Sequence, residues 1–185
     1  MKSRKTLPPW LNRQLRWRPV DAVDAPETIR AWLRDSGSLT RRLQRLGDFH
    51  VETLHETTRA PRPEEGCLLG LRNREAARIR EVLLHLDGAP VVYARTVLPL
   101  RSLRGGNRLL ANMARRSLGA ELFRRPRAHR NAVWAAAIPP SMLPPDVATE
   151  AAWGRLSLFL KRGQPLLVAE VFLPSLWRQL EESLH

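Results

Sequence analysis

Two charged residues, Arg80 and Glu170, stand inside runs of apolar residues. If both runs are strands, alternate residues share a face, and the alternate residues that follow Arg80 or flank Glu170 are valine, leucine or phenylalanine. An ionised group in such surroundings costs free energy unless it is paired or binds a ligand. The two side chains are therefore expected either to pair with each other or to line a closed pocket for a small anion.

The pocket interpretation gives each charge a role. Arg80 would hold a carboxylate, because a planar guanidinium presents two N–H groups to two oxygens at once. Glu170 would handle a hydroxyl group or a proton. Together they predict a site for a small organic acid.

Other site chemistries find little support among the residues. The five histidines show no metal-ligand spacing, and no Gly-x-Ser-x-Gly elbow occurs. Gly105-Gly106 lacks the Lys-Ser/Thr of a phosphate-binding loop. The single cysteine, Cys67, excludes an internal disulfide framework. The residues therefore predict no metal site.

The net charge is strongly positive. Lys and Arg number 31 and Asp and Glu number 18, which gives +13. Such a charge fits a nucleic-acid-binding protein, but the basic residues are scattered and form only short clusters such as Arg124–Arg127. Attraction of small anions is the weaker conclusion that charge alone supports.

Length and hydrophobicity limit the classes of protein to which the chain can belong. A chain of 185 residues with 43% hydrophobic residues suits one folded domain, expected over residues 1–185. The apolar runs are far shorter than the ~20 residues that span a bilayer. The basic N-terminus has no apolar stretch typical of a secretion signal. We expect a cytoplasmic protein, monomeric and without stable membrane insertion.

Two pairs of apolar runs predict β-hairpins. Arg78–Leu86 and Val91–Leu98 flank a four-residue connection that contains Gly88, and residues 155–161 and 166–173 flank a similar one with Gly163. The hairpins resemble each other at an offset of 75 residues, which leaves open an internal duplication or shared turn chemistry. In either case Arg95 and Glu170 occupy equivalent positions.

Helices are expected between the strands. Asp24 and Glu27 have the spacing of a capping box, with Asp24 as N-cap, ahead of apolar residues at helical spacing. Leu39–Leu46 and Asn107–Leu118 predict further helices, the second ended by Gly119. The proline-rich run 139–145 predicts a connection. These elements favour an α+β fold with helices on an antiparallel sheet.

The run Ala77–Pro99 resembles the central block of the chorismate pyruvate-lyase family. The similarity continues through Arg116–Gly119, Trp153–Arg155 and Gly163–Pro174, and more weakly over Trp32–Leu43. The resemblance implies an antiparallel sheet of about six strands, with helical flaps over an internal ligand pocket. It also implies conversion of chorismate to 4-hydroxybenzoate and pyruvate, the first committed step of ubiquinone biosynthesis, without a cofactor.

Four positions match ligand-binding positions of that family. Arg80 matches the ligand-binding arginine, Glu170 the pocket glutamate, and Leu118 a position just before a glycine that contacts the ligand. Leu39 falls where some relatives carry methionine, and it keeps an apolar wall of similar volume.

Chorismate is a dianion, so the resemblance requires cationic partners for two carboxylates. Our hypothesis assigns Arg80 to one carboxylate and either Arg95 or Arg155 to the other. Glu170 would bind the ring hydroxyl and assist proton movement, or the hydrogen would move within chorismate without a protein base.

Two other functions compete with the lyase. Effector domains of some bacterial transcription regulators resemble this fold, which suggests a non-catalytic module that senses small anions. A basic nucleic-acid-binding protein is the second alternative, and salt-dependent DNA binding unaffected by chorismate would favour it.

Overall fold

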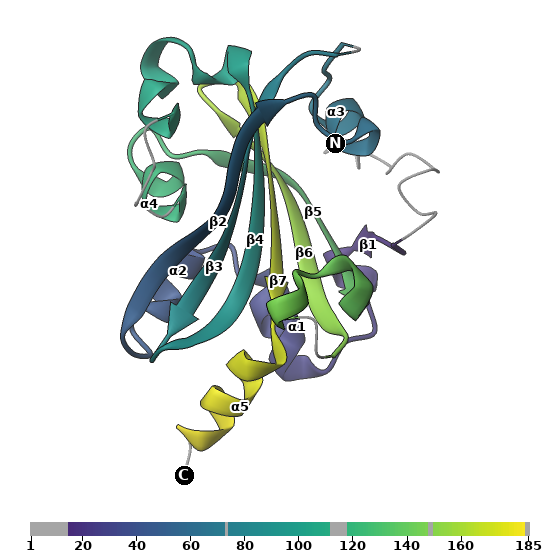
Figure 1. Ribbon diagram of the computed structural model, residues 1–185, viewed down its shortest axis with the longest axis vertical. Helices are drawn as coiled ribbons and strands as arrows, with labels where there is room; N and C mark the ends of the chain where they lie inside the picture. The colour runs from purple at the N-terminus through teal and green to yellow at the C-terminus, as the bar shows by residue number, and fades with distance from the viewer. Residues whose placement is uncertain (1–14, 73, 112–117, 148–149, 184–185) are drawn as a thin grey trace.

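An antiparallel sheet of seven strands forms the centre of the protein (Figure 1). The computed structural model describes residues 15–72, 74–111, 118–147 and 150–183. The strands are Arg18–Pro19 (β1), Phe49–Arg59 (β2), Ala77–Leu86 (β3), Ala89–Pro99 (β4), His129–Ile138 (β5), Ala152–Lys161 (β6) and Gln164–Phe172 (β7). Their order across the sheet is β1-β5-β6-β7-β4-β3-β2. The α+β class is confirmed, and the two-residue β1 adds a strand to the six expected.

Both predicted hairpins are present, β3–β4 and β6–β7. Each closes through a two-residue turn, Asp87-Gly88 in the first and Arg162-Gly163 in the second. All four turn residues have positive φ, between 49° and 81°. A two-residue turn of this kind needs positive φ at both positions, and glycine adopts it without strain. The turn chemistry therefore sets the register of both hairpins.

Strand β7 joins the two hairpins, because it pairs with β6 on one side and with β4 on the other. Glu170 on β7 lies opposite Ala94 on β4, which lies opposite Val82 on β3. Arg80 is two residues from Val82, and alternate residues share a face. Arg80 and Glu170 therefore point to the same side of the sheet, two strands apart.

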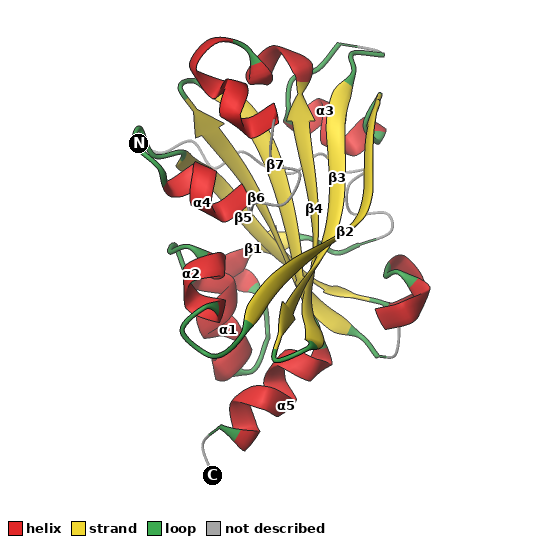
Figure 2. Ribbon diagram, turned by 60° about the vertical axis from the view of Figure 1, so that its left-hand side comes forward, coloured by secondary structure: helices red, strands yellow, loops and turns green. Residues whose placement is uncertain are grey.

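Helices lie on both faces of the sheet. The helices α1 (Glu27–Arg34), α2 (Leu39–Leu43) and α4 (Leu118–Phe123) lie over one face, here called the covered face (Figure 2). The helix α3 (Pro63–Leu68) and the proline-rich connection lie on the opposite side, here called the far face. Arg80 and Glu170 belong to the covered face.

Aromatic packing fixes α1 and the C-terminal helix α5 (Pro174–Glu182) against the end of β7. Trp32 of α1 makes edge-to-face contacts with Phe172 at 6.1 Å and with Trp177 at 6.0 Å between ring centroids. Such contacts add about 0.5–1.5 kcal/mol beyond area burial. They hold the C-terminal end of α1 close to the centre of the sheet.

Several helix boundaries differ from those expected. The residue that precedes α1 is Pro26, and no side chain caps the helix, so the prediction of Asp24 as N-cap is wrong. The helix α2 ends at Leu43, three residues before the expected Leu46. Its N-cap is Ser38, whose hydroxyl accepts a hydrogen bond from the Arg41 N–H.

The segment expected as one helix over Asn107–Leu118 differs from that expectation in its described part. Gly105–Ala111 is a 3-10 helix, and α4 is described over Leu118–Phe123, so Gly119 lies within a helix instead of ending one. Residues 112–117 lie outside the described part of the chain. The proline-rich run is a connection, as predicted, with short 3-10 turns at Pro140–Met142 and Pro145–Val147.

Candidate active site

A cavity lies between the covered face of the sheet and the helices α2 and α4. The volume of the cavity is about 60 Å³. Its walls are mostly apolar, and Leu39 of α2 and Leu118 of α4 form part of its cover. Among the described residues, the charged side chains that line it are Arg80, Arg130 and Glu170.

Arg80 enters the cavity from β3 and is only 5% exposed. Its Nη2 donates a hydrogen bond to Oγ1 of Thr53 at 3.1 Å, and its Nε lies 3.7 Å from Oε2 of Glu56, both on the neighbouring strand β2. Burial lowers the pKa of the Arg80 guanidinium, and Glu56 partly opposes this. The contacts from β2 hold the guanidinium in the cavity wall.

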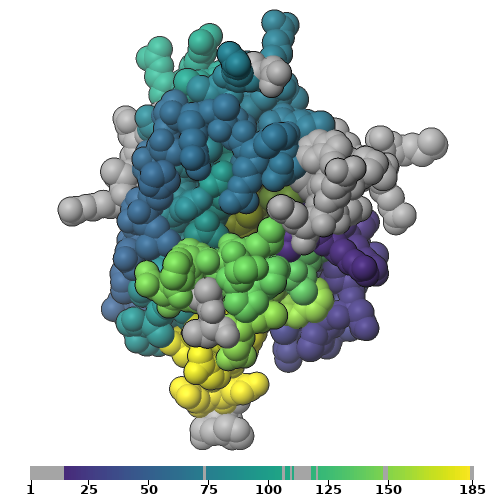
Figure 3. All heavy atoms as spheres, turned by 45° about the vertical axis from the view of Figure 1, so that its right-hand side comes forward, coloured from purple at the N-terminus to yellow at the C-terminus, as the bar shows by residue number. Residues whose placement is uncertain are grey.

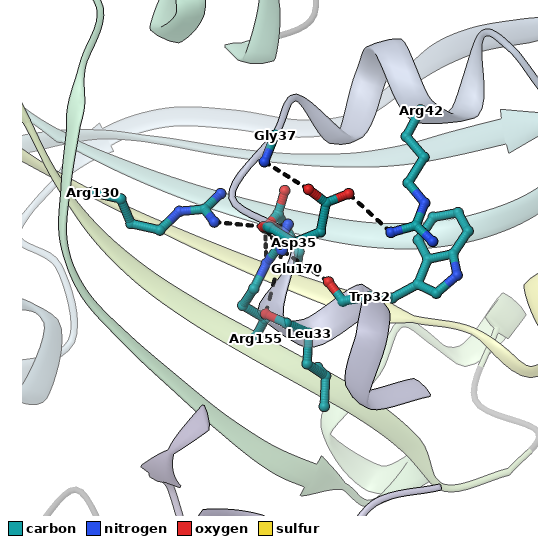
Figure 4. Close-up of polar contacts among 8 residues, drawn as sticks. All are labelled: Trp32, Leu33, Asp35, Gly37, Arg42, Arg130, Arg155 and Glu170. Carbon is teal, nitrogen blue, oxygen red and sulfur yellow. Dashed lines mark hydrogen bonds and ion pairs between the residues drawn. The ribbon is translucent and has the colours of Figure 1, made fainter. Parts of the chain in front are cut away.

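Glu170 lies at the middle of the sheet and is paired with Arg155 of β6. Arg155 contacts one carboxylate oxygen, Oε2, through Nε and Nη2 at 2.8 Å each (Figure 4). Among the described residues, none makes a hydrogen bond to the other oxygen, Oε1. The carboxylate is therefore held by one oxygen and keeps acceptor capacity at the other.

Arg155 also ties the sheet to the cover of the cavity. Its Nη1 donates to the backbone carbonyls of Trp32, Leu33 and Asp35 at 3.0, 3.5 and 2.8 Å, where α1 ends (Figure 4). Arg155 is 1% exposed and does not line the cavity. Arg155 therefore holds the Glu170 carboxylate in place from outside the cavity.

The turn between α1 and α2 is stabilised by the Asp35 side chain. Its carboxylate accepts hydrogen bonds from the Gly37 N–H at 2.7 Å and from Nη1 of Arg42 at 2.9 Å. Burial would raise the pKa of Asp35, but these hydrogen bonds and the charges of Arg42 and Arg155 lower it overall. Arg42 also lies over the Trp32 ring, 3.6 Å from its centroid. The turn is thus fixed above the cavity.

Arg130 of β5 is the third charge in the cavity, and sequence reasoning missed it. Its Nη1 donates to the Asp35 carbonyl at 2.7 Å, beside the hydrogen bond from Arg155 (Figure 4). Its guanidinium carbon lies 5.0 Å from the centroid of Phe159. Burial and the nearby Arg155 lower the pKa of Arg130 to about 10, while Glu170 and Asp35 act in the opposite direction.

A β-bulge explains why Arg130 was missed. Strict alternation along β5 puts Arg130 on the same face as Ala132 and Trp134, and Trp134 packs on the far face. The pairing of β5 with β6 shifts between Arg130 and Ala132, which inserts one extra residue. The shift turns Arg130 to the covered face, where its partner on β6 is Phe159. No regular pattern in the sequence predicts the bulge.

Arg95 does not reach the cavity, contrary to one half of our hypothesis for the second carboxylate. It follows Ala94, a cavity residue, so alternation points Arg95 to the far face. There its Nε and Nη2 contact Glu65 of α3 at 2.7 and 3.0 Å, and Nη1 contacts Glu81 of β3. These carboxylates raise the pKa of Arg95 despite its burial. The buried ion cluster anchors α3 to the sheet.

Four of the six site residues expected from sequence thus line one cavity, and two do not. Leu39, Arg80, Leu118 and Glu170 are brought together, Arg155 braces Glu170 from behind, and Arg95 lies on the far face. The alternative in which Arg80 and Glu170 pair with each other is wrong, because each has its own partner of opposite charge.

A second cleft opens on the far face, between α3 and the proline-rich connection (Figure 3). Its described lining contains one basic side chain, Arg62, and three acidic side chains, Glu64, Glu81 and Asp146. Burial and the nearby Glu81 raise the pKa of Tyr93 in this cleft to about 12. The excess of carboxylates disfavours an anionic ligand, so the cavity on the covered face is the better candidate.

In its described lining, the cavity combines apolar walls with two guanidinium groups and one carboxylate. This set can bind an organic anion through the arginines and a hydroxyl group through the glutamate. No group of three or more metal-ligating side chains is found in the part of the chain that the structure describes. None of the helices in the described ranges is long and apolar enough to span a bilayer.

Comparison with known sequences gives a family match over most of the chain. A family model described as chorismate lyase matches residues 11–182. The chain is 50% identical over 174 residues to a protein named "Probable chorismate pyruvate-lyase" from Alcanivorax borkumensis, covering 94% of this chain and 83% of the relative. A protein of the same name from Thiobacillus denitrificans is 43% identical over 171 residues, covering 88% and 91%.

Comparison with solved structures identifies a shared fold. PhnF from Mycobacterium smegmatis aligns with a TM-score of 0.57 at 16% identity, covering 77% of this chain and 66% of that one. A GntR-family transcriptional regulator from Bacillus cereus aligns with a TM-score of 0.52 at 11% identity, covering 70% and 94%. At these identities the similarity concerns the fold alone.

Proposed function

The chain belongs to the chorismate lyase family, and from this membership we propose that it cleaves chorismate to 4-hydroxybenzoate and pyruvate in the cavity under α2 and α4. The family implies a place at the first committed step of ubiquinone biosynthesis. One observation supports the choice of cavity above others: Arg80 and Glu170 enter it from strands two apart, between apolar walls.

The charges in the cavity suit the substrate. The chorismate ring carries a carboxylate and, on the opposite ring carbon, a hydroxyl group. Arg80 binds the ring carboxylate, and Oε1 of Glu170 accepts a hydrogen bond from the hydroxyl. Two strand spacings, about 10 Å, separate the strands that carry these residues, so one ring can lie between the two side chains. Leu39 and Leu118 pack against the ring from the cover.

The reaction balances without an oxidant or a reductant. The bond between the ring carbon and the ether oxygen breaks, so that the oxygen leaves with the three-carbon side chain, and the hydrogen leaves the ring carbon that bears the hydroxyl. A hydrogen ends on the methylene carbon of the released fragment, which becomes pyruvate. The ring becomes aromatic, which supplies much of the driving force.

Glu170 contributes more as the reaction proceeds. The ring hydroxyl changes from an alcohol to a phenol, which is a stronger acid and a stronger hydrogen-bond donor. Its hydrogen bond to Glu170 therefore strengthens toward the transition state, and such differential binding accelerates a reaction. Arg155 is a positioning residue, since it holds Oε2 and leaves Oε1 toward the ligand. The protein acts chiefly by orientation and electrostatics.

We propose a monomer as the active unit. We also propose that the enzyme acts in the cytoplasm and binds no specific nucleic acid. Gel filtration tests the first point, and a DNA-binding titration at low salt tests the last.

Incubation of the purified protein with chorismate tests the proposed reaction. Chromatography should show 4-hydroxybenzoate rather than another hydroxybenzoate, and lactate dehydrogenase with NADH should detect an equal amount of pyruvate. Chorismate that binds but stays intact would instead support a non-catalytic module that senses small anions. The fold shared with transcription regulators is the reason to include this alternative in the test.

A further inference from the structure

We propose that Arg130 binds the second carboxylate of chorismate, the one on the enolpyruvyl side chain, and so distinguishes the dianionic substrate from the monoanionic product. This inference rests on the proposed function and adds a residue that sequence reasoning did not identify. It follows from the place of Arg130 in the cavity, its hydrogen bonds and the shape of the substrate.

Arg130 is the remaining cation in the described lining of the cavity once Arg80 is assigned to the ring carboxylate. Arg95 is committed to two carboxylates on the far face. Arg155 is committed to Glu170 and to three backbone carbonyls. Among the described residues, the cation left for the second carboxylate of a dianion is therefore Arg130.

The hydrogen bonds of Arg130 leave donors for a ligand. Nη1 donates to the Asp35 carbonyl, whereas Nε is buried and has no hydrogen-bond partner among the described residues. A buried charged donor without a partner is costly, and such cases call for an explanation. A carboxylate on the side that carries Nε would supply the missing acceptor, because adjacent N–H groups of a guanidinium match its two oxygens.

The position of Arg130 matches the shape of chorismate. Arg80 on β3 and Arg130 on β5 lie on opposite sides of β7, which carries Glu170. The side chain of Arg130 reaches the same Asp35 carbonyl as Arg155, the partner of Glu170 (Figure 4). In chorismate the ether carbon is next to the carbon that bears the hydroxyl. With the hydroxyl at Glu170, the enolpyruvyl carboxylate lies at the Arg130 end of the cavity.

The assignment has a consequence for selectivity. Arg130 contacts the part of chorismate that leaves as pyruvate, so it contributes to binding of substrate and not of 4-hydroxybenzoate. The electrostatics agree, since burial and Arg155 weaken the hold of Arg130 on its proton and an anion would restore it. Arg80, in contrast, contacts a carboxylate that substrate and product share.

The test compares Arg130→Gln with Arg80→Gln in the full chain. Three measurements are needed: kcat/KM for chorismate, Kd for 4-hydroxybenzoate, and Kd for 3-(1-carboxyvinyloxy)benzoate, an aromatic dianion that cannot eliminate. For Arg130→Gln we expect kcat/KM and dianion affinity to fall by at least about 30-fold, as for a lost desolvated charge contact. Its affinity for 4-hydroxybenzoate should stay within about threefold. Arg80→Gln should weaken binding of all three ligands.

Each other result overturns the inference. Unchanged dianion binding in Arg130→Gln removes the assigned contact, and equal weakening of 4-hydroxybenzoate and the dianion shows that Arg130 only supports the turn at Asp35. Arg127→Gln, an exposed arginine three residues earlier, is the matched control, and Arg130→Lys should rescue part of the dianion affinity. If the wild-type protein forms no 4-hydroxybenzoate, the proposed function fails, whereas the dianion binding comparison still decides the role of Arg130.

Discussion

Nε and Nη2 of Arg155 both contact a single oxygen of Glu170, Oε2, at 2.8 Å each. The same guanidinium holds the backbone where α1 ends, through the carbonyls of Trp32, Leu33 and Asp35. The orientation of the proposed hydroxyl acceptor is thus coupled to the cover of the cavity. Glu170 is held in place before any ligand arrives, which favours catalysis by orientation.

Replacement of Glu170 by glutamine should lower turnover and product affinity together. The amide keeps the shape but loses the charge that strengthens the hydrogen bond to the phenol. We expect Kd for 4-hydroxybenzoate to rise about 10- to 100-fold, as for loss of a charged hydrogen bond, with a larger loss in kcat. Steady-state kinetics and calorimetry measure both. Glu52→Gln on β2 is a control with an exposed carboxylate, and wild-type values in Glu170→Gln would refute the assigned role.

Replacement of Arg80 by lysine should weaken 4-hydroxybenzoate binding although the charge is kept. A lysine ammonium cannot present two coplanar N–H groups to a carboxylate, and it is less suited to the contacts with Thr53 and Glu56. We expect a loss of about tenfold or more for the lysine variant and about 30-fold or more for alanine. Arg59→Lys, at the exposed end of β2, should bind like the wild type. Tight product binding by Arg80→Ala would place the carboxylate elsewhere.

Replacement of Arg95 by methionine should reduce stability and leave KM unchanged. The substitution leaves Glu65 and Glu81 without their common partner, and breaking a buried ion pair costs about 3–5 kcal/mol. Partial exposure of Glu81 puts the expected loss at the lower end of that range. Urea denaturation measures the free energy of unfolding. A raised KM for chorismate with unchanged stability would contradict the position of Arg95 on the far face.

Gly119 controls how closely α4 approaches α2. A Cβ at this position would lie 2.7 Å from Oγ1 of Thr40, so the Thr40 side chain or one of the two helices would have to shift. Gly119→Ala should therefore loosen the cover and speed dissociation of 4-hydroxybenzoate, measured by stopped-flow fluorescence. Adding Thr40→Ala removes the clash and should recover part of the loss, because substitutions in direct contact are not additive. Additive effects of the two substitutions would rule out this contact.

The Asp35 carboxylate should stabilise the folded protein near neutral pH, and this stabilisation should be lost in acid. Its pKa is lower in the folded protein than the ordinary value of an aspartate, so its stabilising effect is present above about pH 4 and is lost as pH falls through the folded value. The difference in Tm between wild type and Asp35→Asn should be constant from pH 5 to 8 and shrink below pH 4. Asp146→Asn, an exposed control, should show no such trend. A difference that grows in acid would reverse the proposed sign.

The sequence predicts the hairpins and two site residues for clear physical reasons. Glycine in each short connection favours a tight turn, and strand alternation places Arg80 and Glu170 on apolar faces. The same alternation puts Arg95 on the face opposite to Ala94. The match between the two hairpins, in contrast, gave Arg95 a position equivalent to that of Glu170. Arg130 was beyond reach because a bulge, which has no clear sequence signal, reverses its face.

Helix boundaries were harder to predict, because they depend on tertiary contacts. Gly119 has the sequence pattern of a helix end, yet it lies within α4, where it permits close approach to Thr40. Arg155 was predicted as a substrate contact, but its role as a brace depends on backbone carbonyls at the end of α1. Contacts between segments more than 100 residues apart leave no local pattern.

The position of β7 determines when the sheet can be completed during synthesis. This strand follows all the others in the chain but lies between β6 and β4 in the sheet. Two sets of strands, β2, β3 and β4 on one side of β7 and β1, β5 and β6 on the other, therefore leave the ribosome before the strand that joins them. Until β7 is inserted, neither the floor of the cavity nor Glu170 is in place, so the nascent chain gains its binding site only in the final stage of synthesis.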